Sequence, residues 1–462
     1  MTFVCGIIGV FGTDDSLKNT ILGLHALQHR GQEGIGVAWT DGQKIYCEKR
    51  LGYVSELAKT FKLTQSPISV GHLRYSTTGK SEKNNLQPIV VNGIDLKIAI
   101  CHNGNLTNFF SLRKSLEEEG AVFTSEMDTE VIAHLIMKAK GDIISRLKFA
   151  LSKVKGAFSL IIMTPSALIA VRDSLGFRPL CLGRLKNAYV VASETCALDI
   201  IGAEFIREIE QGEILLISKE GIKSEMLEKP KIKRECIFEL IYFARPDSHI
   251  FSRDVWLVRK ELGKMLAIEQ PADADIVIPV PDSGLFAAIG YSEQSGIPFS
   301  YGLVRSHYIG RTFIEPSSQE RASDVRIKLN PIKSVIKGKR IVLIDDSIVR
   351  GTTSRKIVKM LKEAGAKEIH MRISSPPIKF PCYYGIDTPS KGELIASSHS
   401  VEQIKNFIGC DSLGYLSVEG MLKVVGDFYE NGGFCTACFT GNYPIPPEDA
   451  EFISQLRLFR DY

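Results

Sequence analysis

The first half of the chain shows short apolar runs separated by turn residues. Residues 3–11 form an apolar run closed by Gly12, which predicts a buried strand. Apolar residues from Leu17 to Leu27 recur at helical spacing, and Gly31 is expected to end that helix. Further strands are predicted at residues 96–101, 158–163, 167–171, 188–192 and 213–217. Further helices are predicted at residues 112–119 and 129–138. The pattern indicates an α+β domain with much antiparallel sheet.

The second half alternates strand and helix patterns. Strands are predicted at residues 276–280, 340–344 and 368–373, and helices at residues 284–296 and 352–364. This βαβ order predicts an α/β domain with a mostly parallel sheet, whose ligands bind at the carboxyl ends of the strands. The pattern of predicted strands and helices changes at a Lys/Pro-rich stretch, residues 230–234. We therefore expect two domains, residues 5–232 and 233–462.

Composition narrows the class of protein. The chain has 462 residues, of which 44% are hydrophobic and 24% charged, as in ordinary globular proteins. The net charge of +4 gives no reason to expect nucleic acid or an anionic membrane as a partner. No stretch approaches the roughly 18 apolar residues of a membrane helix, and the N-terminus does not resemble a signal peptide. We expect a cytoplasmic enzyme.

Residues 340–353 carry the strongest local signal. An apolar strand ends in Asp345 and Asp346, Gly351 lies in a short turn, and Thr352 and Thr353 begin a helix. Gly351 lets the backbone approach an anion, which a helix N-terminus also favours. The acid pair suits ribose hydroxyls or Mg²⁺. An ordinary turn capped by Thr352 is the alternative, but it leaves two acids beside an anion site without a cation. The pattern predicts a ligand with a ribose, a phosphate and a metal-bound diphosphate.

This loop resembles the phosphoribosyl pyrophosphate signature of type I phosphoribosyltransferases, because strand, acid pair, Gly and Thr-Thr occur in order. The resemblance implies that Asp345 and Asp346 bind the ribose and one Mg²⁺ per subunit. It also implies a set of residues that surround the 5′-phosphate: Ser347, Arg350, Gly351, Thr352 and Thr353.

Two other segments resemble parts of the same family. Residues 279–284 (Pro-Val-Pro-Asp-Ser-Gly) resemble its second ligand loop, which implies that Ser283 lies near the metal and the diphosphate. Residues 308–314 resemble the flexible loop that closes over the substrate. The resemblance makes Arg305 and Arg311 available for the charge of the diphosphate.

Cys5 is the candidate nucleophile of the first half. An N-terminal Cys can use its own α-amine, with a pKa near 8, as the base. This requires removal of the leader, residues 1–4, which we expect. Alone, a Cys at this position would more often be a buried strand residue. The chain, however, contains five segments in one order that together resemble the N-terminal-nucleophile glutamine amidotransferase domain: residues 5–12, 29–33, 71–77, 102–106 and 125–130. The resemblance implies a four-layer αββα fold.

Glutamine hydrolysis needs further groups around the thiolate. An oxyanion hole is worth about 3–4 kcal/mol per donor, and the Asn103 side chain and the Gly104 N–H are the candidates. Arg74 suits the α-carboxylate of glutamine, and Asp128 suits its α-ammonium group. The histidines of two segments are expected to be structural or orienting, since the amine supplies the base.

Four cysteines form a second candidate cluster. Cys435 and Cys438 make a C-x-x-C in a Gly-rich segment expected to be a loop, and Cys236 and Cys382 lie elsewhere in the second half. Such a pair can bind zinc, form a redox pair, bind an iron–sulfur cluster or occur by chance, and spacing alone favours chance or zinc. The remaining cysteines are expected to be inert core residues: Cys47, Cys101, Cys181, Cys196 and Cys410.

Across nearly its full length the chain resembles the glutamine phosphoribosylpyrophosphate amidotransferase family, in its Bacillus-type branch. The resemblance implies that Cys236, Cys382, Cys435 and Cys438 bind one 4Fe-4S cluster per subunit, by thiolates alone and in a structural role. It also implies a homo-oligomer, a tetramer in this family, and inhibition by purine nucleotides.

The expected reaction hydrolyses glutamine at Cys5 and passes ammonia inside the protein to phosphoribosyl pyrophosphate. The products are 5-phosphoribosylamine, diphosphate and glutamate, in the first step of purine biosynthesis. One alternative is a sugar-phosphate isomerising amidotransferase, which shares the first half but lacks an acid-pair loop. The other is a phosphoribosyl pyrophosphate-sensing regulator. Such a protein would have no use for Cys5, Arg74, Asn103 and Asp128, and it would need a DNA-binding face, which this weakly charged chain does not indicate.

Overall fold

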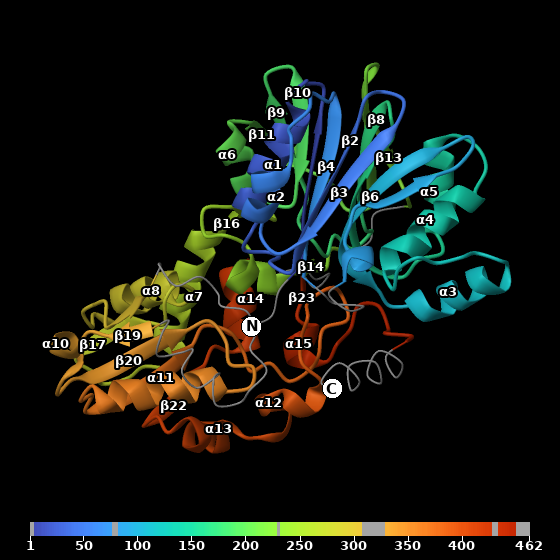
Figure 1. Cartoon of the computed structure of the whole chain (residues 1–462). Coiled ribbons are helices and arrows are strands. Elements are labelled where there is room, and N and C mark those ends of the chain that lie inside the picture. Colours follow the sequence, from blue (N-terminus) through green and yellow to red (C-terminus); the bar gives the residue numbers. More distant parts are fainter. Residues whose placement is uncertain (1–3, 76–81, 229–231, 307–328, 427–432, 450–462) are drawn as a thin grey trace.

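The computed structural model describes residues 4–75, 82–228, 232–306, 329–426 and 433–449. The chain folds into two halves that meet along one junction (Figure 1). The first half, blue to green in Figure 1, contains two large sheets between layers of helices. The second half, yellow to red, is built around a smaller sheet.

The first half begins with a seven-stranded antiparallel sheet in the order β11-β9-β10-β1-β4-β2-β3. Its strands are β1 (Gly6–Phe11), β2 (Gly34–Thr40), β3 (Ile45–Leu51), β4 (Ile68–Arg74), β9 (Cys181–Leu185), β10 (Ala188–Ala192) and β11 (Glu204–Glu208). Strand β1 lies at the centre, between β4 and β10. Cys5 therefore directly precedes the central strand of this sheet.

The second sheet of this half has six antiparallel strands in the order β13-β12-β8-β7-β6-β5. Its strands are β5 (Ile89–Asn92), β6 (Lys97–Leu106), β7 (Gly156–Met163), β8 (Ala167–Arg172), β12 (Glu213–Ser218) and β13 (Gly221–Met226). Ile7 and Val70 of the first sheet pack against Ile161 and Ala170 of this one in a buried core. The two sheets thus form the inner layers of a sandwich.

Helices cover both outer faces of the sandwich. One layer packs on the seven-stranded sheet and contains α1 (Ser16–Ala26), α2 (Val54–Thr60) and α6 (Cys196–Ile201). The other packs on the six-stranded sheet and contains α3 (Phe109–Glu118), α4 (Asp128–Lys138) and α5 (Ile143–Leu151). The predicted four-layer αββα fold is confirmed.

The second half contains a four-stranded parallel sheet in the order β17-β20-β21-β22. Its strands are β17 (Ile276–Pro279), β20 (Arg340–Asp345), β21 (Glu368–Ile373) and β22 (Ser412–Tyr415). One face packs on α7 (Val255–Glu269), α8 (Leu285–Ser295) and α14 (Val418–Val424), and the other on α10 (Lys333–Ile336), α11 (Thr352–Glu363), α12 (Ile395–Ser398) and α13 (Val401–Ile408). The separate pair β18 (Leu303–Arg305) and β19 (Leu329–Pro331) is antiparallel. The predicted α/β domain with a mostly parallel sheet is confirmed.

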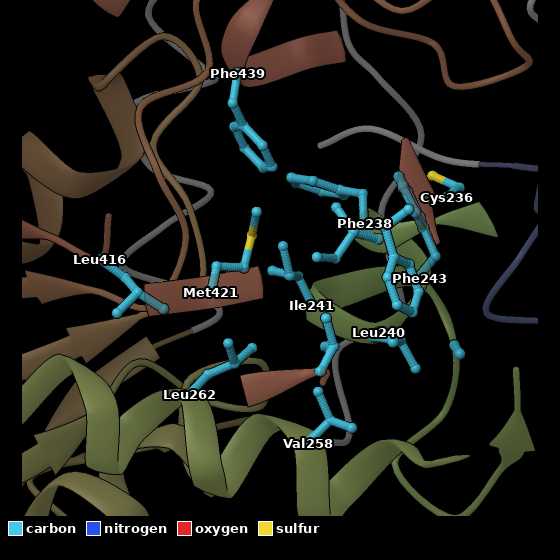
Figure 2. Packing of buried hydrophobic residues seen from close by; sticks show 14 of the residues in the cluster. Cys236, Phe238, Leu240, Ile241, Phe243, Val258, Leu262, Leu416, Met421 and Phe439 are labelled. Carbon is cyan, nitrogen blue, oxygen red and sulfur yellow. The ribbon is translucent and has the colours of Figure 1, made fainter. Parts of the chain in front are cut away.

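Short elements form the junction between the halves. They are the parallel pair β14 (Glu235–Cys236) and β23 (Phe434–Cys435), the helix α15 (Ala437–Thr440), the pair β15 (His249–Ile250) and β16 (Arg253–Asp254), and a π-helical turn, η2 (Glu239–Phe243). Figure 2 shows Leu240 and Ile241 of η2 beside Val258 of α7 and Met421 of α14. Phe177 of the first half belongs to the same buried cluster. This one buried apolar cluster therefore has members in both halves.

Some helices and strands have the bounds that the hydrophobic pattern predicts, and others do not. The strands at residues 188–192 and 368–373 have the predicted bounds. The first helix ends at Ala26 rather than at Gly31, because the chain turns there and the Arg30 N–H bonds to the Leu27 carbonyl. Strands β2 and β4 and helices α5 and α7 were not predicted. Within the described ranges, none of the helices has both the length and the apolar character needed to cross a bilayer.

Candidate functional site

The Cys5 thiol lies in a buried, charged environment at the start of β1. Cys5 is 8% exposed, and its Sγ donates a hydrogen bond to the Tyr75 carbonyl at 3.6 Å. Burial raises the pKa of the thiol, although a backbone hydrogen bond with Tyr75 and the Arg74 charge act in the opposite direction. The carboxylates of Asp128 and Glu33 raise it further. A thiol in this environment needs a base before it can act as a nucleophile.

The predicted oxyanion donors lie on β6. Asn103 is fully buried, and neither its Nδ2 nor its Oδ1 has a hydrogen-bond partner among the described residues. An unpaired buried amide is costly, so such a group indicates a place for a ligand atom. A Cβ at Gly104 would lie 2.0 Å from the Ala157 carbonyl oxygen, so only glycine fits. The strand therefore places two potential donors side by side.

The two predicted glutamine-binding residues lie near each other, because Arg74 Nη1 is 3.4 Å from the sulfur of Met127, which precedes Asp128. Arg74 ends β4, is 1% exposed and donates to the Asn85 carbonyl. Asp128 begins α4, accepts from the Leu106 N–H at 3.0 Å and lies 3.4 Å from His102 Nδ1. Burial opposes ionisation, but His102 and the Leu106 N–H outweigh it and hold the pKa of Asp128 below its usual range. Asp128 is thus an anion suited to a ligand cation.

A buried group that contacts the candidate nucleophile was not among the predicted site residues. Arg30 is 1% exposed, and its Nε donates to the Cys5 carbonyl at 2.9 Å. Its guanidinium also pairs with Glu194 at 2.6 Å and Glu239 at 2.7 Å. His29, expected to be structural or orienting, places Nε2 2.7 Å from Glu194. Arg30 belongs to the His29-Arg-Gly segment of the family resemblance, which could have pointed to it. Its acidic partners, however, lie 164 and 209 positions further along the chain.

The acid pair lies at the carboxyl end of β20. Asp345 and Asp346 are 7% and 5% exposed, and the Asp346 N–H donates to Asp345 Oδ1 at 3.0 Å. Burial and then the charge of Asp346 raise the pKa of Asp345 well above its usual range. Ser283, which follows the neighbouring strand β17, donates to Asp345 Oδ1 at 3.5 Å. The structure therefore brings together the three residues predicted to hold Mg²⁺, and two adjacent buried carboxylates with a hydroxyl fit a hard cation in chemistry.

The turn after the acid pair opens α11. Gly351 occupies the N-cap position with φ +75°, a conformation that favours glycine, so the alternative with Thr352 as the cap is wrong. Thr352 and Thr353 form the first turn, where free N–H groups favour an anion. Arg350 donates to Glu393 Oε1 at 2.5 and 3.0 Å and is half-exposed. The backbone thus fits a phosphate, whereas the Arg350 side chain has a protein partner.

Of the two remaining predicted arginines, one lies within the described residues. Arg305, at the end of β18, donates to Asp282 Oδ2 at 2.5 Å, next to Ser283. It therefore lies beside the second ligand loop. Arg311 and the loop at 308–314 fall outside the described residues.

The four candidate cluster cysteines lie in the junction. Cys236 and Cys435 are register partners in the β14–β23 pair, and Cys438 lies in α15, so the C-x-x-C is not in the expected loop. Cys236, Cys382 and Cys435 belong to one buried cluster against which Cys438 packs, so the four lie in one region. Burial and then the neighbouring thiols raise the pKa of Cys438. Four thiols in apolar surroundings fit an iron–sulfur cluster in chemistry. As placed, though, no three His, Cys, Asp or Glu side chains in the described part are arranged to hold a metal ion.

The other cysteines behave as their sequence context predicts. Burial raises the thiol pKa of Cys47, Cys101, Cys181, Cys196 and Cys410. Thiols of raised pKa are poor nucleophiles at neutral pH. This agrees with an inert role.

Comparisons with known proteins match both halves. The family model of the glutamine amidotransferase domain matches residues 72–199, and that of the phosphoribosyl transferase domain matches residues 266–374. The amidophosphoribosyltransferase of Bacillus subtilis is 49% identical over 449 residues, which are 95% of this chain and 94% of the relative. Amidophosphoribosyltransferase 2, chloroplastic, of Arabidopsis thaliana is 49% identical over 96% of this chain and 80% of its own length.

Solved structures agree over the same extent. Glutamine phosphoribosylpyrophosphate amidotransferase from Bacillus subtilis, complexed with ADP and GMP, superposes with a TM-score of 0.91 at 48% identity and covers 96% of this chain and 98% of its own. A structure described as the allosteric regulatory enzyme of purine biosynthesis gives a TM-score of 0.93 at 47% identity, with 98% and 99% coverage. These relatives combine both halves in one enzyme, which leaves the two alternative functions without support. The chain belongs to the amidophosphoribosyltransferase family, whose glutamine-dependent transfer is the first step of purine biosynthesis.

Proposed function

We propose that Cys5 is the nucleophile of the glutamine half-reaction. Its thiolate attacks the side-chain amide of glutamine, a glutamyl thioester forms and ammonia leaves, and water then releases glutamate. Removal of residues 1–4 would free the Cys5 α-amine to accept the thiol proton. A raised thiol pKa makes such a base necessary. The two domains of this proposal are residues 5–232 and 233–462.

The unpartnered Asn103 amide is the observation that carries this proposal. Asn103 Nδ2 and the Gly104 N–H would donate to the oxyanion that forms on the amide carbonyl. The strand that carries both packs beside the Cys5 strand, because His72, the register partner of Ile7, has its Nε2 3.2 Å from the carbonyl oxygen of His102, which precedes Asn103. Asp128 would then hold the α-ammonium group of glutamine.

Arg74 would hold the α-carboxylate of the same substrate. It is buried at the end of β4, and its charge acts on the Cys5 thiol. A guanidinium is suited to a carboxylate because it offers paired donors in a plane. Together with Asp128 it would fix both ends of the amino acid and thereby orient the side-chain amide.

The second half-reaction would take place at the carboxyl end of β20. Ammonia passes within the protein and attacks C1 of phosphoribosyl pyrophosphate, and diphosphate leaves. Asp345 and Asp346 bind the ribose hydroxyls and Mg²⁺, with Ser283 beside them. Mg²⁺ held by these residues would supply positive charge for the departing diphosphate. The 5′-phosphate lies against the turn and the first turn of α11, formed by Ser347, Arg350, Gly351, Thr352 and Thr353, and Arg350 must leave Glu393 to take part.

Further parts of the proposal come from the family resemblance. We infer one Mg²⁺ and one 4Fe-4S cluster per subunit, the cluster bound by Cys236, Cys382, Cys435 and Cys438. The Bacillus subtilis relative was solved with ADP and GMP, which supports inhibition of this chain by purine nucleotides. Arg305 and Arg311 are proposed to meet the diphosphate. We also infer that the enzyme is a homo-oligomer, a tetramer, and that it acts in the cytoplasm.

Replacement of the nucleophile tests the glutamine site. In Cys5→Ala, glutamine-dependent diphosphate release should fall by more than about a thousandfold, because removal of a nucleophile abolishes the covalent route. The rate with ammonium salts should be retained, since the second site is intact. Cys47→Ala serves as the control and should retain both rates. Glutamine use by Cys5→Ala would show that the nucleophile is assigned wrongly.

The acid pair is tested by Asp346→Asn. The value of kcat/KM for phosphoribosyl pyrophosphate should fall by at least about a hundredfold in steady-state assays, because a metal and ribose ligand loses its charge. Thioester formation from glutamine should continue. Asp275→Asn, at the other end of the sheet beside Arg340, is the control. A change confined to glutamine kinetics would contradict the assignment.

Metal analysis tests the four cysteines. Protein purified without oxygen should contain about four irons and four sulfides per subunit. Cys438→Ser should lose most of this iron, whereas Cys196→Ser should keep it. Zinc in place of iron, or no metal at all in the wild type, would refute the cluster.

A further inference from the structure

A buried ionic contact joins the nucleophile residue to the second half of the chain. Arg30 Nε donates to the Cys5 carbonyl at 2.9 Å. The Arg30 Nη1 and Nη2 atoms donate to the two carboxylate oxygens of Glu239 at 2.9 and 2.7 Å. Both side chains are 0% exposed. Glu239 opens η2, so an element that follows β14 reaches the residue that precedes β1.

The same carboxylate is also connected to β6, the strand that carries Asn103 and Gly104. Glu239 Oε1 accepts from Arg178 Nη1 at 3.0 Å. Arg178 Nε and Nη2 donate to the Tyr384 carbonyl at 3.1 and 2.8 Å. The next residue, Gly385, lies against Gly104, because a Cβ at Gly385 would be 2.7 Å from the Gly104 carbonyl carbon. A displacement of Glu239 would therefore also shift the backbone of Gly104, through Arg178 and the Tyr384-Gly385 segment.

Charge balance explains why the network is held together. Two guanidinium groups, of Arg30 and Arg178, face two carboxylates, of Glu194 and Glu239, all without solvent. His29 and Arg30 hold the pKa of Glu194 below its usual range against the effect of burial. Buried ion pairs are weak contributors to net stability, but loss of one partner leaves an uncompensated charge. The network therefore favours one geometry strongly.

We propose that Glu239 is a positioning residue for glutamine cleavage, which holds Cys5 through Arg30 and the Gly104 strand through Arg178 and Tyr384. The proposal rests on the proposed role of Cys5 as the nucleophile. Because Glu239 belongs to the second half, the glutamine site is complete only when the two halves are docked. Glu239 does not touch glutamine, and its effect is on the distance between the thiolate and the oxyanion donors.

The test compares Glu239→Gln, Glu239→Asp and a matched control in the full-length enzyme. Glu239→Gln keeps the shape but removes the charge, and Glu239→Asp keeps the charge but shortens the reach. Glu213→Gln is the control, because Glu213 is a 2%-exposed carboxylate paired with Arg207 at 2.7 Å and contacts none of the proposed site residues. The readouts are glutamine-dependent and ammonia-dependent diphosphate release, and the rate at which a glutamine-shaped chloroketone alkylates Cys5.

For Glu239→Gln, kcat with glutamine should fall by about a hundredfold, as expected for a misplacement of about 1 Å, with KM for glutamine nearly unchanged. Alkylation of Cys5 should slow in parallel. The ammonia-dependent rate should stay within about twofold of wild type, which shows that the variant is folded. Glu239→Asp should restore part of the loss, and Glu213→Gln should behave as wild type.

Two results would overturn the proposal. One is a glutamine-dependent rate of Glu239→Gln within twofold of wild type, and the other is an equal fall of the glutamine and ammonia rates, which would make the residue a general structural support. Cys5→Ala, run in parallel, separates the two levels of inference. If Cys5→Ala still uses glutamine, the proposed nucleophile fails. If it does not, while Glu239→Gln is unaffected, only the role of Glu239 fails.

Discussion

The shared carboxylate of Glu239, between Arg30 and Arg178, is the contact on which the relation of the two halves depends. Each of these charges is fully buried, and a charge without water must find its partner within the protein. Two of the partners come from the first half and one from the second. Separation of the halves would leave both arginines without Glu239, so the network strongly favours one docked arrangement. The apolar cluster around it, in which Val4 and Phe177 meet η2, excludes the water that would weaken these pairs.

The π-helical turn η2 is also held by a buried arginine of α7. Arg259, on α7, donates to the Leu240 carbonyl at 2.9 Å and to the Ala244 carbonyl at 2.7 Å. Burial lowers the pKa of Arg259 to about 10, and the charge of Asp346 acts in the opposite direction. Arg259 therefore fixes the turn that carries Glu239 to α7 of the second half.

Sequence alone was sufficient where the chemistry is contiguous. The loop of Asp345, Asp346 and Gly351 could be predicted because strand, acids, glycine and helix start lie within a few positions of one another. The four-layer fold and the parallel sheet followed from hydrophobic periodicity together with family resemblance. Strand β2 was missed because its glycine-rich start, Gly34-Ile-Gly36, does not look like a strand until neighbours on both sides bury it.

The rest depends on contacts between distant positions. Arg30 and Glu239 are 209 residues apart, and no local sequence pattern indicates that they form an ion pair. Nor does the sequence show that Arg350, predicted to bind a phosphate, has Glu393 as a partner. The close approach of Gly385 to Gly104 is likewise invisible, because a glycine in a Tyr-Tyr-Gly turn has many local explanations. Tertiary structure alone identifies which glycine and which carboxylate support the site.

A double-mutant cycle tests most directly whether one network holds the thiol and the oxyanion strand together. The measured quantity is kcat/KM for glutamine in wild type, Glu239→Gln, Gly385→Ala and the double variant. We expect a combined loss smaller than the sum of the single losses by at least about 1 kcal/mol, because both changes disturb the same contact between Gly385 and Gly104. Losses that add to within about 0.5 kcal/mol would instead show two independent supports, and no single network.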